Sequence, residues 1–317
     1  MSMVIYFISL LVLISAFVIY DPSFAGAGTG YTETLTYTGK AASPATLVSG
    51  DTVTVTGDEQ PAVIFTGSAD AELQGVKLSA GGKFDANNKG AVFINSGSSI
   101  RIASSDIVAE GEYGIGITVD SRILRSSSYS SVDIVNTDIS GKNNSKGIMV
   151  QDNSSVTVTN SSIKVQNCGI DITGTGKNNL LNVERSTIVV SGDGTDGGVG
   201  VRLLSCGGKS TIKSSDITVN GSGYAMSGVY TSGTRYYQDG SDNDKLKEYS
   251  ADVRVHNAVN IEDSKINVKG NDNETGFAVN VTDNACVNIK NSIITTEGQQ
   301  KYGVEVYLGS SADIAGT

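Results

Sequence analysis

Catalytic chemistry requires nucleophiles, acids and bases that are brought together, and this sequence contains few candidates for such a site. His256 is the single histidine of the chain. A serine–histidine–aspartate arrangement around His256 is conceivable, but no Gly-x-Ser-x-Gly elbow accompanies it. The three cysteines, Cys168, Cys206 and Cys286, have long spacings that match neither a disulfide framework nor a zinc motif. We therefore predict no catalytic residues, a structural role for His256, and cysteines buried as small hydrophobic side chains.

Three acidic turns raise the question of a calcium site. They cover residues 193–196, 239–244 and 271–274, and each combines Asp, Asn or Glu with small residues. None follows the twelve-residue order of calcium ligands that ends in a glutamate. Asp and Asn are also ordinary turn residues. We accordingly predict neither a metal site nor a cofactor.

Two long segments gather residue types that proteins use to bind partners. The longer segment runs from Thr231 to Asn257, and the shorter one, from Thr118 to Ser130, carries Arg122, Arg125 and Tyr129. Tyrosine and arginine are enriched at the centres of binding interfaces. We predict that the longer segment is a binding loop, and the alternative is a solvated loop without a partner. The predicted binding residues are Arg235, Tyr236, Tyr237, Lys245, Lys247 and Tyr249.

A repeat organises the rest of the sequence and must position these segments. Seven segments share one spacing, in which an isoleucine follows two residues after a serine or threonine. The isoleucines are Ile107, Ile139, Ile163, Ile188, Ile217, Ile266 and Ile294. The hydroxyl residues are Ser105, Thr137, Ser161, Ser186, Ser215, Ser264 and Ser292. We expect each hydroxyl to bond the backbone at a tight corner.

A second element, a glycine followed by alternating apolar residues, precedes most of these segments. Alternation with a period of two predicts a strand with one face in the core and one face outside. We expect the glycines to supply positive φ angles at another corner. The element begins at Gly90, Gly114, Gly147, Gly169, Gly198, Gly228, Gly276 and Gly303.

Together, the two elements predict a solenoid. The shortest spacing between equivalent positions is 24 residues, from Val132 to Val156, which accommodates about three short strands and their turns. One such coil cannot bury its inner face, whereas stacked coils can. A sandwich would need hairpin turns between strands, and a propeller would carry aromatic signatures in longer repeats. We therefore predict an all-β, right-handed parallel β-helix of about eight to ten coils.

The ends of the chain differ from the repeat. An apolar run from Val4 to Tyr20, followed by Ser23 and Ala25, predicts a signal peptide over residues 1–25, with a retained membrane anchor as the alternative. Residues 26–89 fit the repeat loosely and are interpreted as an N-terminal cap with degenerate first coils. Residues 90–317 hold the regular repeats. Because Ala312 and Ile314 match two repeat positions, we expect the C-terminus to fall inside a coil, as in a truncated chain.

The charge of the chain limits its partners. There are 23 basic and 33 acidic residues, which give a formal net charge of −10. Nucleic acids and anionic membranes bind basic surfaces most strongly. We therefore predict no nucleic-acid partner, and we interpret the negative charge as a source of solubility for an extracellular protein.

With its signal-like start, few cysteines and Ser/Asn-rich coils, the sequence resembles the passenger domain of a bacterial autotransporter, or a related pectin-lyase-like β-helix adhesin. The resemblance covers roughly residues 26–317. It implies export, display at the cell surface or outer membrane, and adhesion to a host or cell-surface glycan or protein. It also implies an outer-membrane translocator barrel as a partner outside residues 1–317.

The same scaffold carries polysaccharide lyases and glycoside hydrolases, which resemble this chain equally in fold. Those families cluster Asp with Arg, Lys or His on one strand face, and we expect no such cluster on these coils. Our prediction is therefore a secreted or surface-displayed, non-enzymatic adhesin or structural stalk. The alternative is a polysaccharide lyase or glycoside hydrolase on the same β-helix.

Overall fold

The computed structural model describes residues 28–39, 47–84, 89–121, 129–151, 153–173, 179–192, 197–204, 206–222, 226–233, 257–270 and 275–317. Within these ranges the regular secondary structure consists of strands alone. No helix in the described part of the chain has the length and apolar character that a membrane span requires. The predicted signal peptide, residues 1–25, lies outside the described residues.

The strands form three sheets, here named A, B and C. Sheet A contains β1 (Gly30–Tyr31), β3 (Thr52–Val55), β6 (Lys77–Ala80), β9 (Asp106–Ala109), β12 (Asp138–Gly141), β15 (Ser162–Val165), β18 (Thr187–Gly192), β21 (Asp216–Gly221), β24 (Lys265–Gly270) and β27 (Ile293–Glu297). Sheet B contains β2 (Leu35–Thr38), β4 (Val63–Thr66), β7 (Val92–Asn95), β10 (Ile115–Asp120), β13 (Lys146–Gln151), β16 (Cys168–Thr173), β19 (Val199–Leu204), β22 (Met226–Ser232), β25 (Gly276–Thr282) and β28 (Lys301–Val306). Sheet C contains β5 (Asp70–Gln74), β8 (Ser99–Ala103), β11 (Ser130–Val135), β14 (Ser154–Thr159), β17 (Leu180–Glu184), β20 (Lys209–Lys213), β23 (Ala258–Glu262), β26 (Cys286–Lys290) and β29 (Ser311–Ala315).

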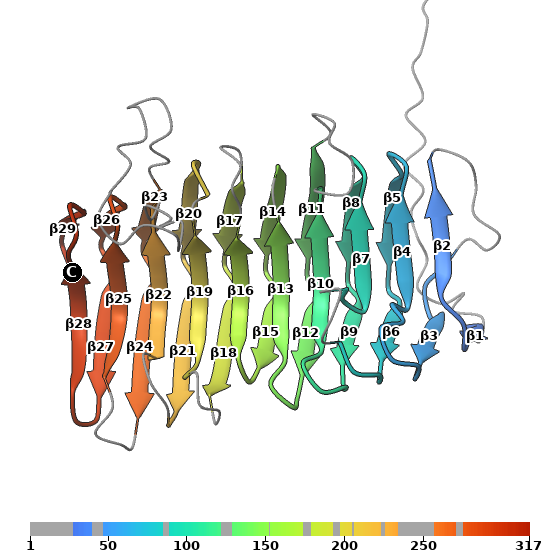
Figure 1. Cartoon of the computed structure of the whole chain (residues 1–317), viewed down its shortest axis with the longest axis horizontal. Coiled ribbons are helices and arrows are strands. Elements are labelled where there is room, and N and C mark those ends of the chain that lie inside the picture. The colour runs from blue at the N-terminus through green and yellow to red at the C-terminus, as the bar shows by residue number, and fades with distance from the viewer. Residues whose placement is uncertain are drawn as a thin grey trace, which may run out of the picture.

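From β3 onwards the chain visits the three sheets in turn, so that each described coil adds one strand to each sheet, while β1 and β2 before it belong to sheets A and B (Figure 1). Neighbouring strands are parallel throughout the described ranges. The buried Val, Ile and Leu side chains of all three sheets form one continuous core. The predicted all-β parallel β-helix is therefore confirmed.

The repeated isoleucines form an unbroken interior row in sheet A. Ile139 pairs with Ile107 on one side and with Ile163 on the other. The row continues from Ile163 through Ile188, Ile217, Ile266 and Ile294. In the other direction, Val53 and Leu78 extend it into the first coils. The strict spacing of the isoleucine from the hydroxyl residue two positions before it is thus a consequence of stacking, because each side chain packs on its equivalent one coil away.

The repeated hydroxyls make the corner contacts expected from the sequence. The hydroxyl of Ser161 accepts a hydrogen bond from the backbone N–H of Thr137 at 3.1 Å and donates one to the carbonyl of Thr159 at 2.8 Å. The N–H of Ser161 in turn donates to the hydroxyl of Ser186 at 3.1 Å. The same pattern runs from Val76 to Ser292. This row of hydroxyls pairs backbone groups that would otherwise be buried without a partner.

The role expected for the repeated glycines is wrong, because none of the eight has a positive φ angle. A Cβ on Gly169 would lie 2.4 Å from Cγ2 of Ile188 and 2.5 Å from the carbonyl oxygen of Gly200. Glycine is required at this coil because sheet B approaches the isoleucine row of sheet A too closely there for a Cβ. The left-handed corner residues instead precede the hydroxyls, with φ angles between 48° and 50°; they are Ser104, Asn136, Asn160, Arg185, Ser214, Asp263 and Asn291.

The observed register also corrects the alignment of the glycine element. Ile117 pairs with Ile148, and Ile170 pairs with Val201. Gly116 and Gly200, rather than Gly114 and Gly198, therefore occupy the tight position next to the isoleucines. Val92 pairs with Ile117 and Val229 pairs with Val279, which places Ala91 and Ala278 there instead of Gly90 and Gly276. The residues two positions after these small residues lie side by side in sheet B. They form a different row from the one obtained when the repeats are aligned on the glycines listed in the sequence analysis.

Candidate functional site

The residues that the sequence singled out lie mostly outside the described part of the chain. All six predicted binding residues, Arg235, Tyr236, Tyr237, Lys245, Lys247 and Tyr249, fall within residues 234–256, which are outside it. The same holds for His256, Arg122, Arg125 and the three acidic turns. Tyr129, from the shorter segment, is described and is 41% exposed just before β11. The binding-loop hypothesis therefore remains a prediction, and the described site lies elsewhere.

That site is built on a row of side chains on the outer face of sheet B. The row does not belong to the apolar core, and its members change in type from coil to coil. Thr118, Met149 and Asp171 are buried although they are on the outer face. The register places the row in the order Phe93, Thr118, Met149, Asp171, Arg202, Tyr230, Asn280 and Glu305. We call these eight residues the outer row of sheet B.

A buried ionic cluster occupies the middle of the outer row. Nζ of Lys146 donates to Oδ2 of Asp171 at 2.8 Å, and Nε of Arg202 donates to Oδ1 at 2.8 Å. A second nitrogen of Arg202, Nη2, also donates a hydrogen bond to Oδ2 of Asp171. The Asp171 side chain is 2% exposed, whereas the two cations are 25% and 31% exposed. Both carboxylate oxygens are thus paired with cations.

The cluster fixes its own charge state. Burial would raise the pKa of Asp171, but the hydrogen bond from Arg202 and the charges of Lys146 and Arg202 outweigh it and lower that pKa to about 2. The partner carboxylate in turn raises the pKa of Arg202 against the effect of burial. Burial, and then the nearby charge of Asp171, raise the pKa of the Cys168 thiol to about 12. All three groups therefore keep one protonation state near neutral pH.

The expectation that no aspartate clusters with arginine and lysine on one strand face is wrong. Lys146, Asp171 and Arg202 come from β13, β16 and β19, which lie side by side in sheet B. Their geometry nevertheless does not suit acid–base chemistry, which needs a group that exchanges protons near the working pH. Asp171 is saturated with hydrogen bonds and holds no proton, and Arg202 is held as a cation. The cluster anchors Arg202.

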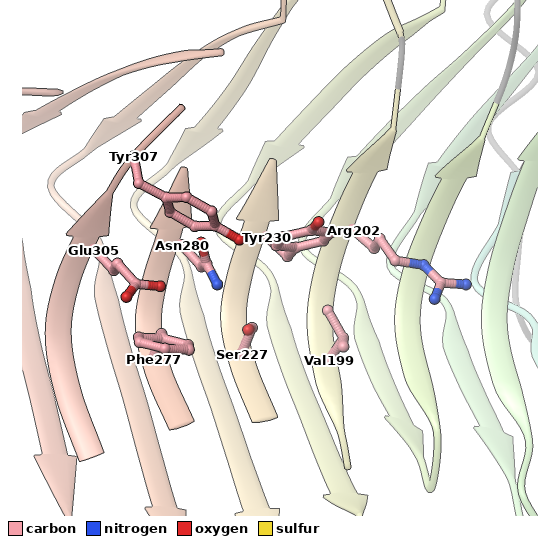
Figure 2. Close-up of a pocket in the computed structure, with 8 residues that line it drawn as sticks. All are labelled: Val199, Arg202, Ser227, Tyr230, Phe277, Asn280, Glu305 and Tyr307. Carbon is pink, nitrogen blue, oxygen red and sulfur yellow. The ribbon is translucent and has the colours of Figure 1, made fainter. Parts of the chain in front are cut away.

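A pocket lies beside the cluster, on β19, β22, β25 and β28. Its volume is about 490 Å³, within the range of small-molecule sites, which is about 300–1,000 Å³. Figure 2 shows two rows of side chains that line it, and Tyr307 reaches over from beyond the end of β28. One row comes from the outer row of sheet B and holds Arg202, Tyr230, Asn280 and Glu305; the other holds Val199, Ser227 and Phe277.

The centre of the pocket is neutral, and its charges lie at the two ends. In Figure 2 the guanidinium of Arg202 points away from the centre, towards the neighbouring strand that carries Asp171. Glu305 lies at the opposite end and has no ion-pair partner among the described residues. Tyr307 lies over Asn280, with its hydroxyl directed towards Tyr230. The pocket therefore presents tyrosine rings and an amide at its middle.

One buried polar atom of a residue that lines this pocket has no hydrogen-bond partner among the described residues. Asn280 is 7% exposed, and its Oδ1 is buried without a partner. The ring of Phe277, which is 8% exposed, stacks on Tyr302 with centroids 5.7 Å apart, so it is held in place at the pocket wall. Asn280 and its neighbours were missed in the sequence because they share no residue type. The signal that would have revealed them is the position two residues after the small residue, glycine or alanine, that lies next to the isoleucine row.

The cysteines and the remaining acidic groups add no second site. Cys168 and Cys206 are buried and Cys286 is half-buried, and all three are free thiols. Within the described ranges, no three His, Cys, Asp or Glu side chains gather as a metal ion would require.

The fold and the pocket define the class of this protein as a three-sheet parallel β-helix with a polar and aromatic cavity on one outer face. The chain matches none of the protein-family models, curated proteins or solved structures with which it was compared.

Proposed function

We propose that this chain is a non-enzymatic β-helix, secreted or displayed at a bacterial cell surface in the manner of an autotransporter passenger, that binds an extracellular ligand. The pocket on the outer face of sheet B carries this proposal. A long stack of coils holds the pocket on a rigid scaffold, since every strand that lines it pairs with neighbours on both sides, except at the C-terminal coil. Rigid scaffolds suit binding because little conformational entropy is lost when the ligand is bound.

The chemistry of the pocket supports binding over turnover. Among its eight lining residues, Glu305 is the single carboxylate, and none is a histidine. Glycoside hydrolysis uses a pair of carboxyl groups on either side of the scissile bond. The next carboxylate along the row, Asp171, is buried and paired with two cations, which leaves the cluster with one excess positive charge. A lyase or hydrolase therefore remains the weaker proposal.

The net charge supports the choice of partner. With a formal charge of −10, the chain gains no counterion release from a polyanion. Tyrosine, phenylalanine and asparagine at the pocket are typical of surfaces that recognise proteins and glycans through apolar area and hydrogen bonds. We therefore propose a host or cell-surface glycan or protein as the ligand.

An adhesion assay tests the proposal. The purified chain, immobilised on beads, is expected to retain cells or an arrayed set of glycans and matrix proteins. Tyr307→Ala removes a 44% exposed ring over the pocket and should weaken binding about tenfold, as at an interface hot spot. Tyr129→Ala, which removes a 41% exposed ring far along the solenoid, is the matched control and should bind as the wild type.

The predicted binding loop is tested with a separate variant. Residues 235–255 are replaced by a short Gly/Ser linker that keeps Ser232 and Asn257, because Asn257 accepts the N–H of Cys206 at 2.7 Å and Ser232 donates to Asp283 at 2.9 Å. Loss of binding in this variant, with Tyr307→Ala unaffected, would move the site to the loop. Turnover of acidic polysaccharides by the purified chain, with or without calcium, would overturn the non-enzymatic proposal.

A further inference from the structure

The two ends of the pocket carry opposite charges. At one end, Lys146 and Arg202 share the single carboxylate of Asp171, so this cluster keeps one excess positive charge, and both cations are partly exposed. At the other end, the half-buried carboxylate of Glu305 lines the pocket and has no ion-pair partner among the described residues. A ligand with one charge of each sign would complement both ends.

The strand spacing gives the distance between the two ends. Arg202, Tyr230, Asn280 and Glu305 lie on four neighbouring strands of sheet B, β19, β22, β25 and β28. Neighbouring strands are about 4.8 Å apart, so Arg202 and Glu305 are separated by roughly 14 Å along the solenoid axis. Because the Debye length at physiological salt is about 8 Å, each end attracts a ligand charge largely independently of the other.

The middle of the pocket is aromatic. Tyr230, Phe277 and Tyr307 line it together, and in Figure 2 the carboxylate of Glu305 is directed towards β25, between the rings of Tyr307 and Phe277. Aromatic rings bind apolar groups and, at their faces, cations. A carboxylate beside such rings suits the apolar stem and the charged head of a lysine or arginine side chain.

An extended peptide matches this arrangement of charges and rings. Its residues rise by about 3.4 Å each, and residues i, i+2 and i+4 point to the same side. Residues i and i+4 are therefore roughly 14 Å apart, the separation between Arg202 and Glu305. The side chain of residue i+2 then falls on the aromatic middle of the pocket.

We infer that the pocket binds an extended segment of a partner protein whose residues i and i+4 carry opposite charges. The acidic side chain lies at the cluster of Lys146, Asp171 and Arg202, and the basic side chain lies at Glu305. An apolar side chain between them packs on the pocket aromatics. This assignment rests on the proposed binding function and names the class of its ligand.

The test measures fluorescence polarisation of labelled, end-blocked peptides with the intact chain. The two probes are Asp-Ser-Phe-Ser-Lys and Lys-Ser-Phe-Ser-Asp, because an extended segment can lie in either direction. Asp-Ser-Phe-Lys-Ser has the composition of the first probe but places its charges on opposite sides, and Asp-Ser-Phe-Ser-Asp lacks the cation. At least one of the two probes is expected to bind the wild type about fivefold more tightly than either control peptide, as for a partly exposed ion pair.

Variants of the chain test each end of the pocket. Glu305→Gln should weaken the better probe about fivefold without lowering the melting temperature. The matched control is Asp313→Asn, because Asp313 is an exposed carboxylate on β29 of the same coil but in sheet C, outside the pocket. Glu305→Lys should reverse the preference in favour of Asp-Ser-Phe-Ser-Asp. Lys146→Gln removes the excess positive charge while Asp171 stays paired with Arg202, and should weaken every peptide with an acidic end.

Equal binding of all four peptides, equal effects of Glu305→Gln and Asp313→Asn, or an unchanged preference in Glu305→Lys would each overturn the assignment. Binding of oligoglucuronate or of a neutral oligosaccharide, with no measurable binding of any peptide, would also overturn it. Adhesion of the wild type to cells or matrix protein in those cases would leave the proposed function standing.

Discussion

The interior row of sheet A and the outer row of sheet B run along the same stack of coils but differ in what they allow. The interior row repeats isoleucine from Ile107 to Ile294, and all but its last member are buried in the core. The outer row changes from methionine to aspartate, arginine, tyrosine, asparagine and glutamate over successive coils. Stacking favours one residue type at each interior position. The outer face is free to vary, and an ionic cluster and a pocket lie there.

The largest expected effect on stability comes from truncating a side chain of the interior row. Ile163→Ala removes a fully buried side chain, so the free energy of unfolding should fall by about 2–5 kcal/mol. Lys164→Ala, one residue further along β15 and exposed, should change it by less than about 0.5 kcal/mol. Urea unfolding followed by circular dichroism measures both. Equal effects of the two substitutions would contradict the assignment of interior and outer positions.

The next largest effect tests the contact between the two sheets. A Cβ on Gly169 would collide with Ile188 and with backbone, so Gly169→Ala should destabilise by about 1–3 kcal/mol. Gly303 occupies the equivalent position in β28, but there the nearest atom to a Cβ is Cγ2 of Ile294 at 3.9 Å. Gly303→Ala should therefore be neutral or slightly stabilising. A similar loss of melting temperature at both positions would show that close approach is not the reason for glycine.

A smaller effect, which depends on pH, tests the ionic cluster on the outer row. The pKa of Asp171 is lowered to about 2, below its ordinary value of 3.8, so the ionised form stabilises the folded chain above about pH 4. The contribution, about 2 kcal/mol, is lost as the pH falls from about 4 to about 2. Urea midpoints of the wild type and Asp171→Asn should therefore differ near pH 6 and converge near pH 2. A constant difference across this range would rule out the shifted carboxylate.

The smallest perturbation concerns the thiols and leaves stability unchanged. Burial raises the pKa of Cys168 to about 12 and raises that of Cys206 as well, so neither forms a thiolate near pH 8. Iodoacetamide should label the folded chain at Cys286 alone, which is half-buried. Mass spectrometry after brief treatment, with the urea-unfolded chain as the control for all three thiols, reads out the sites. Rapid labelling of Cys168 in the folded chain would mean that sheet B opens.

The interior of the fold was predictable because stacking imposes one residue type on one position. The isoleucines and the corner hydroxyls have strict spacing in the sequence, and both make the contacts expected of them. The reason for the glycines was not predictable, since close approach to Cγ2 of Ile188 depends on the distance between two sheets. Periodicity within one strand carries no information about that distance.

The candidate site was hidden for a related reason. Two small residues occur two positions apart at Gly114 and Gly116, and again at Gly198 and Gly200, and alternation alone does not say which one lies against the isoleucines. Choosing the first of each pair separates Asp171 from Arg202, although they bond in the structure. Pockets assembled from unlike residues of successive coils become visible only when the register is known.

The row of corner hydroxyls gives the solenoid a direction. Each backbone N–H at this corner finds its acceptor in the following coil, as Thr137 does in Ser161 and Ser215 does in Ser264. A coil at the growing end therefore has an open donor until its successor is laid down, and the addition of that successor closes it. If coils are added from the N-terminal side, each new coil forms the corner hydrogen bond of the coil before it. If coils unfold from the C-terminal side, these hydrogen bonds break one coil at a time. Each coil therefore stabilises the corner of the preceding coil.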